Sequence, residues 1–427
     1  MNTLLIVSGK LTSFISKTLN LGNGSTWPGH IALSLNNNFV SDVLESSKTK
    51  IVFVTGTNGK TTTAKLIKTI LEKNGQSVFL NKSGANLLNG IASSLIIESD
   101  IFGRVKKDFA IFEIDENALR QVSQKIKPDY LIVLNLFRDQ LDRYGEINTI
   151  SKNWSEIYEK LKDKTEFILN ADDPQIAYLG MQHTLKKVYF GLNNLSLKTN
   201  IPQAAADSIL CPRCSTRLVI NPVYYSHLGN WSCPKCKLKR PQLDIEKNSV
   251  YPLEGVYNMY NVLAAVLLAK EIGISQTNID KSLLDFKPAF GRQEEITVEG
   301  KKVKFFLAKN PTSFNESLRT INALGAKYLL MVLNDRIPDG RDVSWIWDID
   351  FEIFVGPKIE IFSAGDRAYD MSLRLKYSDI KHKTFEDLNE AVKESLTNLP
   401  KGETLFVLPT YSAMLEVRKI LTGKKIL

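Results

Sequence analysis

The chain has 427 residues, about two to four domains, of which 43% are hydrophobic and 24% charged. These values are typical of globular proteins and exclude a disordered chain, a coiled coil and a disulfide-stabilised miniprotein. The 55 basic side chains outnumber the 46 acidic ones, and the net charge of +9 favours anionic partners such as phosphates, nucleic acid or an anionic membrane surface. All four cysteines lie between Cys211 and Cys236.

The N-terminal region has neither the pattern of an export signal nor that of a membrane span. No basic residue precedes the apolar residues 4–7, and the longest apolar stretch beside a candidate helix, 262–269, is far shorter than the ~20 residues that cross a bilayer. We therefore expect a cytoplasmic protein. Residues 3–19 have apolar positions at helical spacing and predict an amphipathic helix docked on the protein's own core rather than a membrane anchor.

Strand-like and helix-like stretches alternate from about residue 48. The pattern predicts a strand at 50–54, a glycine loop, and a helix at 60–73 that ends at Asn74-Gly75. Further strands are predicted at 77–80, 109–114, 130–134, 166–169 and 187–190, with helices at 116–125 and 149–161. This alternation predicts a largely parallel sheet covered by helices, the α/β class.

A segment rich in Cys, Pro and Lys interrupts the pattern at 207–243, before a helix predicted at 257–272. A second α/β unit follows Gly291. It begins with a predicted hairpin and continues with strands at 328–333, 359–363 and 404–408 and helices at 313–324, 367–375, 385–396 and 412–421. We expect an N-terminal segment (1–47), a nucleotide-binding domain (48–293) that carries the insert (207–243), and a smaller C-terminal α/β domain (294–427).

Residues 54–63, VTGTNGKTTT, have the composition and the setting of a phosphate-binding loop. Gly56 and Gly59 allow the backbone to turn its N–H groups toward phosphate oxygens, and the following helix adds its positive N-terminal end. Lys60 would reach the terminal phosphates, and Thr61 would place its hydroxyl on Mg²⁺. The loop therefore implies ATP or GTP.

Acidic residues follow a neighbouring predicted strand, where a phosphoryl-transfer site needs metal ligands. The strand at 109–114 places Glu113, Asp115 and Glu116 at its carboxyl edge, which is where parallel sheets bind ligands. Beside the phosphate loop, Glu113 is the preferred candidate for a Mg²⁺ ligand.

The four cysteines form two Cys-x-x-Cys pairs, Cys211/Cys214 and Cys233/Cys236, separated by eighteen residues. This is the spacing of a zinc ribbon, and four thiolates leave no open position for water, so we expect a structural Zn²⁺. Redox dithiols and disulfides are the alternatives. The insert is also basic, which has two interpretations. It could bind nucleic acid, or it could be a solvated loop that stabilises the protein or docks a partner. We favour the solvated loop.

Five segments in order are similar to the central domain of Mur ligases, which make amide bonds on peptidoglycan precursors through an acyl-phosphate. They are TGTNGKTTT, FEIDE, NLFRDQLDRYGE (135–146), NADDP (170–174) and GVYNMYNVLAA (255–265). Two later segments, LAKNPTSFNE (307–316) and DGRDVSWIWDIDFE (339–352), resemble the C-terminal domain of the MurT group, the ligase-like subunits of lipid II isoglutaminyl synthases. The resemblance implies a Mur-ligase-like P-loop domain with an inserted zinc ribbon and a Rossmann-like C-terminal domain.

The resemblance also implies roles for particular residues. Asn258 would lie against the adenine, Arg292 would approach the nucleotide phosphates, and Lys60 and Glu113 would serve the chemical step. The expected ATP-binding loop residues are Gly56, Thr57, Asn58, Gly59, Lys60, Thr61 and Thr62.

The chain departs from the usual Mur ligase pattern at two places. Gln140 stands where those enzymes have a metal-binding His, and Phe306 and Lys309 replace an Asp and a His before the C-terminal domain. These departures fit a specialised relative better than an amino-acid-adding ligase.

Amidation requires ammonia, and hydrolysis of glutamine requires a Cys nucleophile activated by a His. Because all four cysteines are assigned to the ribbon, a separate glutaminase subunit is expected, which in the MurT family is GatD. The ligase subunit is thought to lend an acid to the Cys-His pair of that partner. Asp342, Asp348 and Asp350 compete for this role, and we choose Asp348 because Trp347 and Ile349 flank it.

We therefore expect ATP-dependent amidation of the D-glutamate α-carboxylate of the lipid II stem peptide to D-isoglutamine. The positive charge suits a pyrophosphate-linked substrate at the inner face of a membrane, and no nucleic-acid partner is expected. Two alternatives remain: a stand-alone ligase of the Mur or folylpolyglutamate type, and a zinc-ribbon NTPase that binds nucleic acid.

Overall fold

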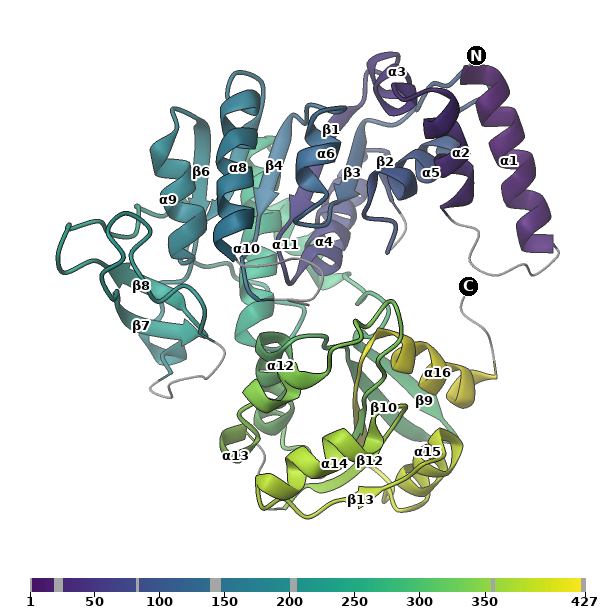
Figure 1. Cartoon of the computed structure of the whole chain (residues 1–427), viewed down its shortest axis with the longest axis vertical. Coiled ribbons are helices and arrows are strands. Elements are labelled where there is room, and N and C mark those ends of the chain that lie inside the picture. The colour runs from purple at the N-terminus through teal and green to yellow at the C-terminus, as the bar shows by residue number, and fades with distance from the viewer. Residues whose placement is uncertain are drawn as a thin grey trace.

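The computed structural model describes residues 2–18, 26–81, 84–138, 147–199, 206–354 and 358–423. Two six-stranded sheets, each with helices on its faces, lie one above the other, and a small two-stranded unit projects at the side of the upper one (Figure 1). Gln140, the substituted metal-ligand position, lies outside the described residues.

The upper sheet is parallel throughout, as the alternating pattern predicts. Its strands are β1 (Lys50–Thr55), β2 (Val78–Leu80), β3 (Phe109–Glu113), β4 (Tyr130–Val133), β5 (Glu166–Asn170) and β6 (Lys186–Phe190). The spatial order is β2-β3-β1-β4-β5-β6, so that β1 has β3 on one side and β4 on the other. The loops that follow these three strands therefore meet at one edge, the usual ligand edge of such a sheet.

Helices bury both faces of the upper sheet, which explains why its strands are continuously apolar. One face packs against α5 (Leu88–Glu98), α6 (Leu119–Ser123), α8 (Ile147–Leu161) and α9 (Pro174–Gln182). The other packs against α4 (Lys60–Lys73), α10 (Val256–Glu271) and α11 (Gln276–Leu284). The predicted helix at 116–125 is shorter in the structure because Asp115 accepts a hydrogen bond from the Asn117 N–H, which forms a turn before α6.

Three N-terminal helices extend the first of these layers: α1 (Asn2–Thr18), α2 (Trp27–Leu35) and α3 (Phe39–Glu45). Leu5 and Ile6 of α1 are buried against the domain, as the predicted docked helix requires. Leu4 and Leu11, on the opposite side of α1, are 75% and 58% exposed. None of the helices in the described ranges has the length and apolar character needed to cross a membrane.

The lower sheet has the order β13-β12-β11-β14-β10-β9. Its strands are β9 (Arg292–Val298), β10 (Lys301–Phe306), β11 (Tyr328–Val332), β12 (Glu360–Ala364), β13 (Lys383–Thr384) and β14 (Thr404–Pro409). β9 and β10 form the predicted antiparallel hairpin, and Glu299 and Gly300 at its turn both have positive φ, 49° and 75°. The other strand pairs are parallel.

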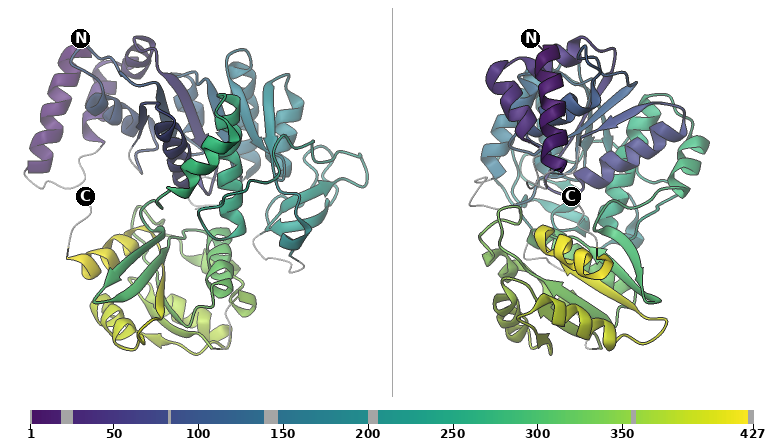
Figure 2. Two further views of the ribbon diagram at one scale, coloured as in Figure 1. Left: turned by 180° about the vertical axis from the view of Figure 1, so that it is seen from behind. Right: turned by 90° about the vertical axis from the view of Figure 1, so that its right-hand side faces the viewer.

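Helices also cover both faces of the lower sheet (Figure 2). One side holds α12 (Pro311–Ala323), the short η2 (Ser344–Asp348) and α13 (Phe351–Phe354), and α14 (Ala368–Tyr377). The other side holds α15 (Leu388–Thr397) and α16 (Tyr411–Thr422).

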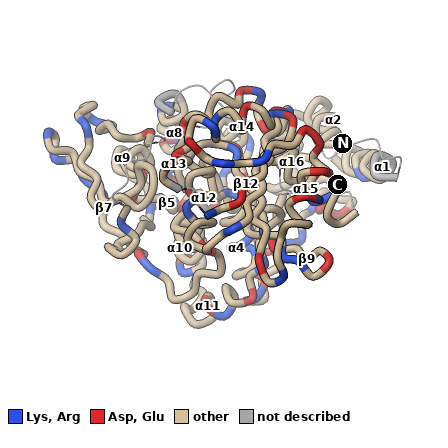
Figure 3. Tube along the Cα trace, turned by 90° about the horizontal axis from the view of Figure 1, so that it is seen from below, with Lys and Arg blue, Asp and Glu red and all other residues tan. Residues whose placement is uncertain are grey.

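The predicted insert forms an antiparallel hairpin of β7 (Val219–Tyr225) and β8 (Leu228–Ser232), with the short η1 (Leu195–Leu197) before it. Lys and Arg outnumber acidic residues along this unit, which lies at the left of Figure 3. Residues 207–243 contain six basic residues and a single acidic one, Asp207. The Asp207 carboxylate pairs with Arg138, which follows β4.

Candidate functional site

The loop between β1 and α4 has a backbone that only glycine accommodates at two positions. Gly56 and Gly59 have φ values of 131° and 93°. A Cβ atom on Gly59 would lie 2.1 Å from Oδ1 of Asn261 on α10, and one on Gly56 would lie 2.9 Å from the carbonyl oxygen of Asn135. The two glycines therefore allow the loop to pass directly over α10 and over the end of β4.

Asn135, which follows β4, holds the loop in this shape. Its carbonyl oxygen accepts a hydrogen bond from the Thr57 N–H at 3.0 Å, and its Oδ1 accepts one from the Asn58 N–H at 2.8 Å. These two loop N–H groups are thus committed internally. The N–H groups at the start of α4 are available as phosphate-binding donors, because the first N–H groups of a helix have no intrahelical partner.

The predicted basic and acidic residues meet at the carboxyl edge of the sheet. The Lys60 ammonium lies 2.9 Å from Oε2 of Glu116, and the Thr61 hydroxyl donates to Oε2 of Glu113 at 2.7 Å. Burial alone would raise the pKa of Glu116, but the charges of Lys60 and Lys309 outweigh it and hold the pKa below its ordinary value. The structure thus brings Glu116, as well as Glu113, to the loop.

Thr61 and Glu113 fit the first ligands of a Mg²⁺ ion. A hydroxyl oxygen and a carboxylate oxygen are hard ligands of the kind Mg²⁺ prefers, and the substrate phosphates and water supply the rest. Burial raises the pKa of Glu113, and the hydrogen bond from Thr61 and the charge of Arg292 offset only part of that rise. A buried carboxylate with a raised pKa is one that a divalent cation stabilises in its charged form.

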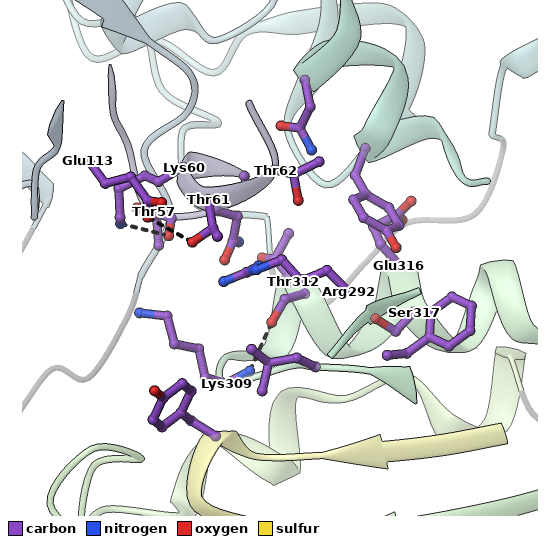
Figure 4. A pocket seen from close by; sticks show the side chains of 18 of the residues that line it. Thr57, Lys60, Thr61, Thr62, Glu113, Arg292, Lys309, Thr312, Glu316 and Ser317 are labelled. Carbon is purple, nitrogen blue, oxygen red and sulfur yellow. Dashed lines mark hydrogen bonds between the residues drawn. The ribbon is translucent and has the colours of Figure 1, made fainter. Parts of the chain in front are cut away.

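A cavity of about 590 Å³ extends from this loop to the lower sheet. All but one of the residues assigned from the sequence to the nucleotide and its Mg²⁺ line the cavity wall: Thr57, Asn58, Gly59, Lys60, Thr61, Thr62, Glu113, Asn258 and Arg292. Figure 4 shows Arg292 beneath Thr61, with Glu316 farther along the wall. The exception is Gly56, at the start of the loop, which is not among the lining residues.

Arg292 and Gln293 connect the two domains and also line the cavity. Gln293 has a left-handed φ of 61° and is fixed by the upper domain, since its side chain exchanges hydrogen bonds with the backbone of Glu254 at 2.7 and 2.9 Å. It also donates to the Tyr257 hydroxyl at 2.9 Å. Asn258 is buried in the same region and donates to the Glu254 carbonyl at 2.7 Å.

The C-terminal domain contributes a wall that the sequence did not assign to the site. Lys309, Thr312 and Glu316 line the cavity. In Figure 4, the Lys309 side chain extends toward the end of the cavity that holds Lys60 and Glu113. The sequence marked this segment only through the resemblance of residues 307–316 to a family's C-terminal domain and through Lys309 as a departure from the Mur ligase pattern.

Asn310 links this wall directly to the phosphate loop. Its Nδ2 donates to Oδ1 of Asn58 at 3.0 Å, and Asn58 Nδ2 donates to Oδ1 of Asn310 at 3.3 Å. Asn310 is also the N-cap of α12, where its side chain accepts from the Ser313 N–H at 2.8 Å. The start of α12 is therefore held against the loop.

The four cysteines of the insert come together, as their spacing predicts. All four sulfur atoms lie within 4.8 Å of one another; Cys211 and Cys236 are 3.6 Å apart, and Cys214 and Cys233 are 3.5 Å apart. In a tetrahedral zinc site with Zn–S bonds of about 2.3 Å, the sulfur atoms lie about 3.8 Å apart. The two sulfur atoms of a disulfide lie about 2.05 Å apart. All four are free thiols, and the donor set fits a closed zinc site.

The three aspartates considered for a partner subunit lie in different surroundings. Asp342 accepts a hydrogen bond from the Ser344 N–H, and Asp350 accepts one from Asn315. Asp348 is 46% exposed, and the Arg138 guanidinium lies 3.9 Å from its carboxylate. Asp342 is exposed as well, so the feature that distinguishes Asp348 is its long ion pair with Arg138.

Family models and solved structures define the class of protein to which the chain belongs. The middle-domain model of Mur ligases matches residues 54–269, and the MurT ligase C-terminal model matches 307–414. A pseudomurein peptide ligase type C from Methanothermus fervidus superimposes with a TM-score of 0.66 at 22% identity, over 88% of this chain and 79% of that one. MurF from Thermotoga maritima, in complex with ADP, superimposes with a TM-score of 0.64 at 15% identity, over 90% and 81%. The chain therefore has the Mur ligase fold, with a parallel central domain and a C-terminal domain.

Sequence relatives define the family. The MurT subunit of the glutamine-hydrolysing lipid II isoglutaminyl synthase of Streptococcus pneumoniae strain R6 is 33% identical over 99% of this chain and 98% of its own length. The corresponding subunit of Staphylococcus aureus strain COL is 32% identical over 92% and 91%. The chain belongs to the MurT family.

Proposed function

We propose that this chain is the ligase subunit of a lipid II isoglutaminyl synthase and amidates the α-carboxylate of D-glutamate in the stem peptide. A carboxylate oxygen attacks the γ-phosphorus of ATP, and the bond to ADP breaks. Ammonia then attacks the acyl carbon, and phosphate leaves with the electron pair of the C–O bond while the nitrogen loses a proton. The observation that carries this proposal is the cavity in which Lys60, Thr61 and Glu113 face a MurT-type C-terminal domain.

Under this proposal, the chain's own residues bind and orient the phosphates. The first turn of α4 and Lys60 hold the β- and γ-phosphates from above, and Lys309 approaches from the opposite wall. Two cations around the transferring group stabilise the negative charge that builds up on its oxygens. Thr61 and Glu113 hold Mg²⁺, which neutralises phosphate charge when bound. Arg292 contacts a phosphate, and Asn258 lies at the adenine.

We further propose that Cys211, Cys214, Cys233 and Cys236 hold a structural Zn²⁺. Their separations fit the metal, and four thiolates complete its coordination. With these thiols committed, the chain has no cysteine to hydrolyse glutamine. A GatD-like glutaminase subunit therefore supplies ammonia, and Asp348 is the residue that orients the histidine of that subunit.

We place the protein at the inner face of the cell membrane, where a lipid-linked substrate is found. Support comes from α1, whose outward side is apolar at Leu4 and Leu11 and whose only charged residues are Lys10 and Lys17. The Lys10 ammonium donates to the Ser99 carbonyl of the domain, so the exposed apolar side of α1 is the part that suits a bilayer interface. Vesicles containing phosphatidylglycerol should pellet the chain, and the variant Leu4→Ser/Leu11→Ser should pellet less; equal pelleting of the two proteins would contradict this placement.

An amidation assay tests the central proposal. Lipid II, ATP, Mg²⁺ and glutamine are incubated with the chain and a GatD-type glutaminase, and D-isoglutamine is measured by mass spectrometry. We expect product only with both proteins present, and none with Lys60→Ala. Lys68→Ala, on the exposed side of α4, is the matched control and should retain activity. Consumption of a free amino acid without a glutaminase would instead indicate a stand-alone ligase.

A further inference from the structure

The hairpin of the cysteine insert reaches the nucleotide cavity. Tyr225, the last residue of β7, is only 2% exposed and lines the cavity in company with Tyr257 and Asn258. Its ring lies 5.6 Å from that of Tyr260 in an edge-to-face arrangement and 5.9 Å from that of Phe137. Neighbouring aromatic rings therefore fix the position of Tyr225 in the wall.

The tip of the hairpin is inserted into the upper domain. Ser226 turns the chain in a left-handed conformation, with φ of 48°, and His227 is fully buried behind it. Nε2 of His227 lies 3.4 Å from Oδ2 of Asp173, and its ring centre is 4.9 Å from that of Phe137. His227 thus holds the tip of the hairpin through a buried polar contact with Asp173 and a ring contact with Phe137.

The base of the hairpin is joined to the cysteine cluster. The fully buried Trp231 of β8 packs with Cys211 and Cys233, and its indole N–H donates to the Ala171 carbonyl at 2.9 Å. Farther along the insert, Arg240 donates to Oδ1 of the buried Asp172 at 2.7 Å. These contacts attach the cysteine cluster to the end of β5.

Asp172 continues this connection toward the cavity. Its Oδ2 accepts a hydrogen bond at 2.7 Å from the hydroxyl of Tyr260, the residue whose ring supports Tyr225. One buried carboxylate therefore joins Arg240 of the insert to the aromatic group around Tyr225.

The C-terminal domain holds the hairpin from the other side. Arg319 of α12 donates to the carbonyl oxygen of Tyr224 at 2.8 Å. The same guanidinium lies 3.7 Å from Glu316, which lines the cavity. The residue next to Tyr225 is therefore attached to the domain that forms the opposite wall.

We infer that the cysteine insert completes the nucleotide site: Tyr225 packs against the base of the bound nucleotide, and an ordered four-cysteine cluster is required to keep it there. This inference rests on the proposed nucleotide role of the cavity. It assigns the insert a part in ligand binding in addition to folding. Because the hairpin is anchored at its base by the cysteines and at its tip by His227, loosening the base removes one of the two anchors of the strand that carries Tyr225.

Calorimetric titration of the full chain with ADP and Mg²⁺ tests the role of Tyr225. Tyr225→Ala should raise the Kd about tenfold, as expected for loss of an aromatic ring stacked on a base. Tyr225→Phe should bind as the unaltered protein does, because the ring is retained. Val219→Ala, at the exposed start of the same strand, is the matched control. Unchanged binding by Tyr225→Ala overturns the inference.

Lys60→Ala separates failure of this inference from failure of the proposed function. If Lys60→Ala also binds ADP normally, the assignment of the cavity to a nucleotide is wrong. If Lys60→Ala loses binding while Tyr225→Ala keeps it, only the role of the insert is wrong.

The role of the cysteines is tested by the same titration. Cys214→Ser/Cys236→Ser should weaken ADP binding about as much as Tyr225→Ala, and the triple variant should be little weaker than either, because both changes act through one contact. Independent, multiplying losses would overturn the link. Circular dichroism and thermal unfolding establish that the remaining structure is retained.

Trp231→Phe provides a second route if the cysteine variant fails to fold. It keeps all four cysteines and removes the hydrogen bond to Ala171, so the Kd should rise about threefold. No change in Kd with Trp231→Phe would also overturn the link.

Discussion

The two walls of the cavity are built in different ways. On the upper wall, the phosphate loop and the first turn of α4 place Gly59, Lys60 and Thr61 side by side in the sequence. On the lower wall, Lys309 and Glu316 lie about a hundred residues before Tyr411 in the sequence. The upper wall is therefore specified by local backbone geometry, and the lower wall by the packing of one domain on another.

A change in loop geometry should have the largest effect on the upper wall. Gly59→Ala introduces a Cβ where φ is 93° and where Asn261 lies 2.1 Å away, so it should lower the free energy of unfolding by about 3 kcal/mol. Gly75→Ala is the control, since φ there is 81° but no atom lies within 4 Å, and it should cost about 1 kcal/mol. Urea denaturation measures both, and equal losses would show that close approach to α10 is unimportant.

Removal of a charge should affect the lower wall without a loss of stability. Lys309→Ala is expected to lower kcat/KM for ATP about a hundredfold, the usual effect of losing one group that stabilises transition-state charge. Lys302→Ala, at a largely exposed lysine on β10, the strand that precedes Lys309, is the control and should change nothing. A fall in thermal stability comparable to the loss of activity would instead make Lys309 a structural residue.

The pH dependence of stability should reveal the buried acid between the walls. Because burial raises the pKa of Glu113 above its ordinary value of 4.5, the folded protein binds a proton more tightly than the unfolded chain does. This contribution to stability is complete below about pH 4.5 and is lost as pH rises through the folded pKa. Glu113→Gln should flatten the profile in that window when unfolding is followed by circular dichroism.

Mg²⁺ supplies the complementary measurement. A cation at Thr61 and Glu113 favours the charged carboxylate, so Mg²⁺ with ADP should raise the melting temperature more at pH 7.5 than at pH 5. An equal rise at both pH values would argue against Glu113 as a ligand.

The smallest expected effect concerns the contact between the walls. Asn58 and Asn310 exchange two hydrogen bonds, so a double-mutant cycle with alanine should give a coupling energy of about 1 kcal/mol. The cycle is needed because Asn310→Ala also removes the cap of α12. A coupling energy near zero, measured from thermal unfolding, would mean that the domains are held by other contacts.

The difference between local geometry and domain packing explains which features could be predicted from the sequence. The helix at 60–73 and the strands around it were found at nearly the predicted bounds because glycine spacing and apolar periodicity are local signals. The insert was recognised because Cys-x-x-Cys pairs are specific. Helix α9 was missed, although Asp173 and Pro174 form a standard helix start.

The remaining site residues had no local signal. Lys309 was noticed only as a departure from a family pattern, and Tyr225 was not singled out within the insert that carries the two cysteine pairs. Their place in the cavity depends on how the C-terminal domain and the insert pack against the phosphate-loop domain, and neither arrangement leaves a period or motif in the sequence.

The junction of the two domains has a consequence of its own. Arg292 opens the first strand of the lower sheet and faces the cavity, while Gln293 beside it is bonded to Glu254 of the upper domain. Under the proposed function, the interdomain attachment and the phosphate contact are adjacent residues. If the lower domain rotated about this junction, the Arg292 guanidinium would move along an arc of very small radius, whereas Lys309, which lies farther from the junction, would move much farther.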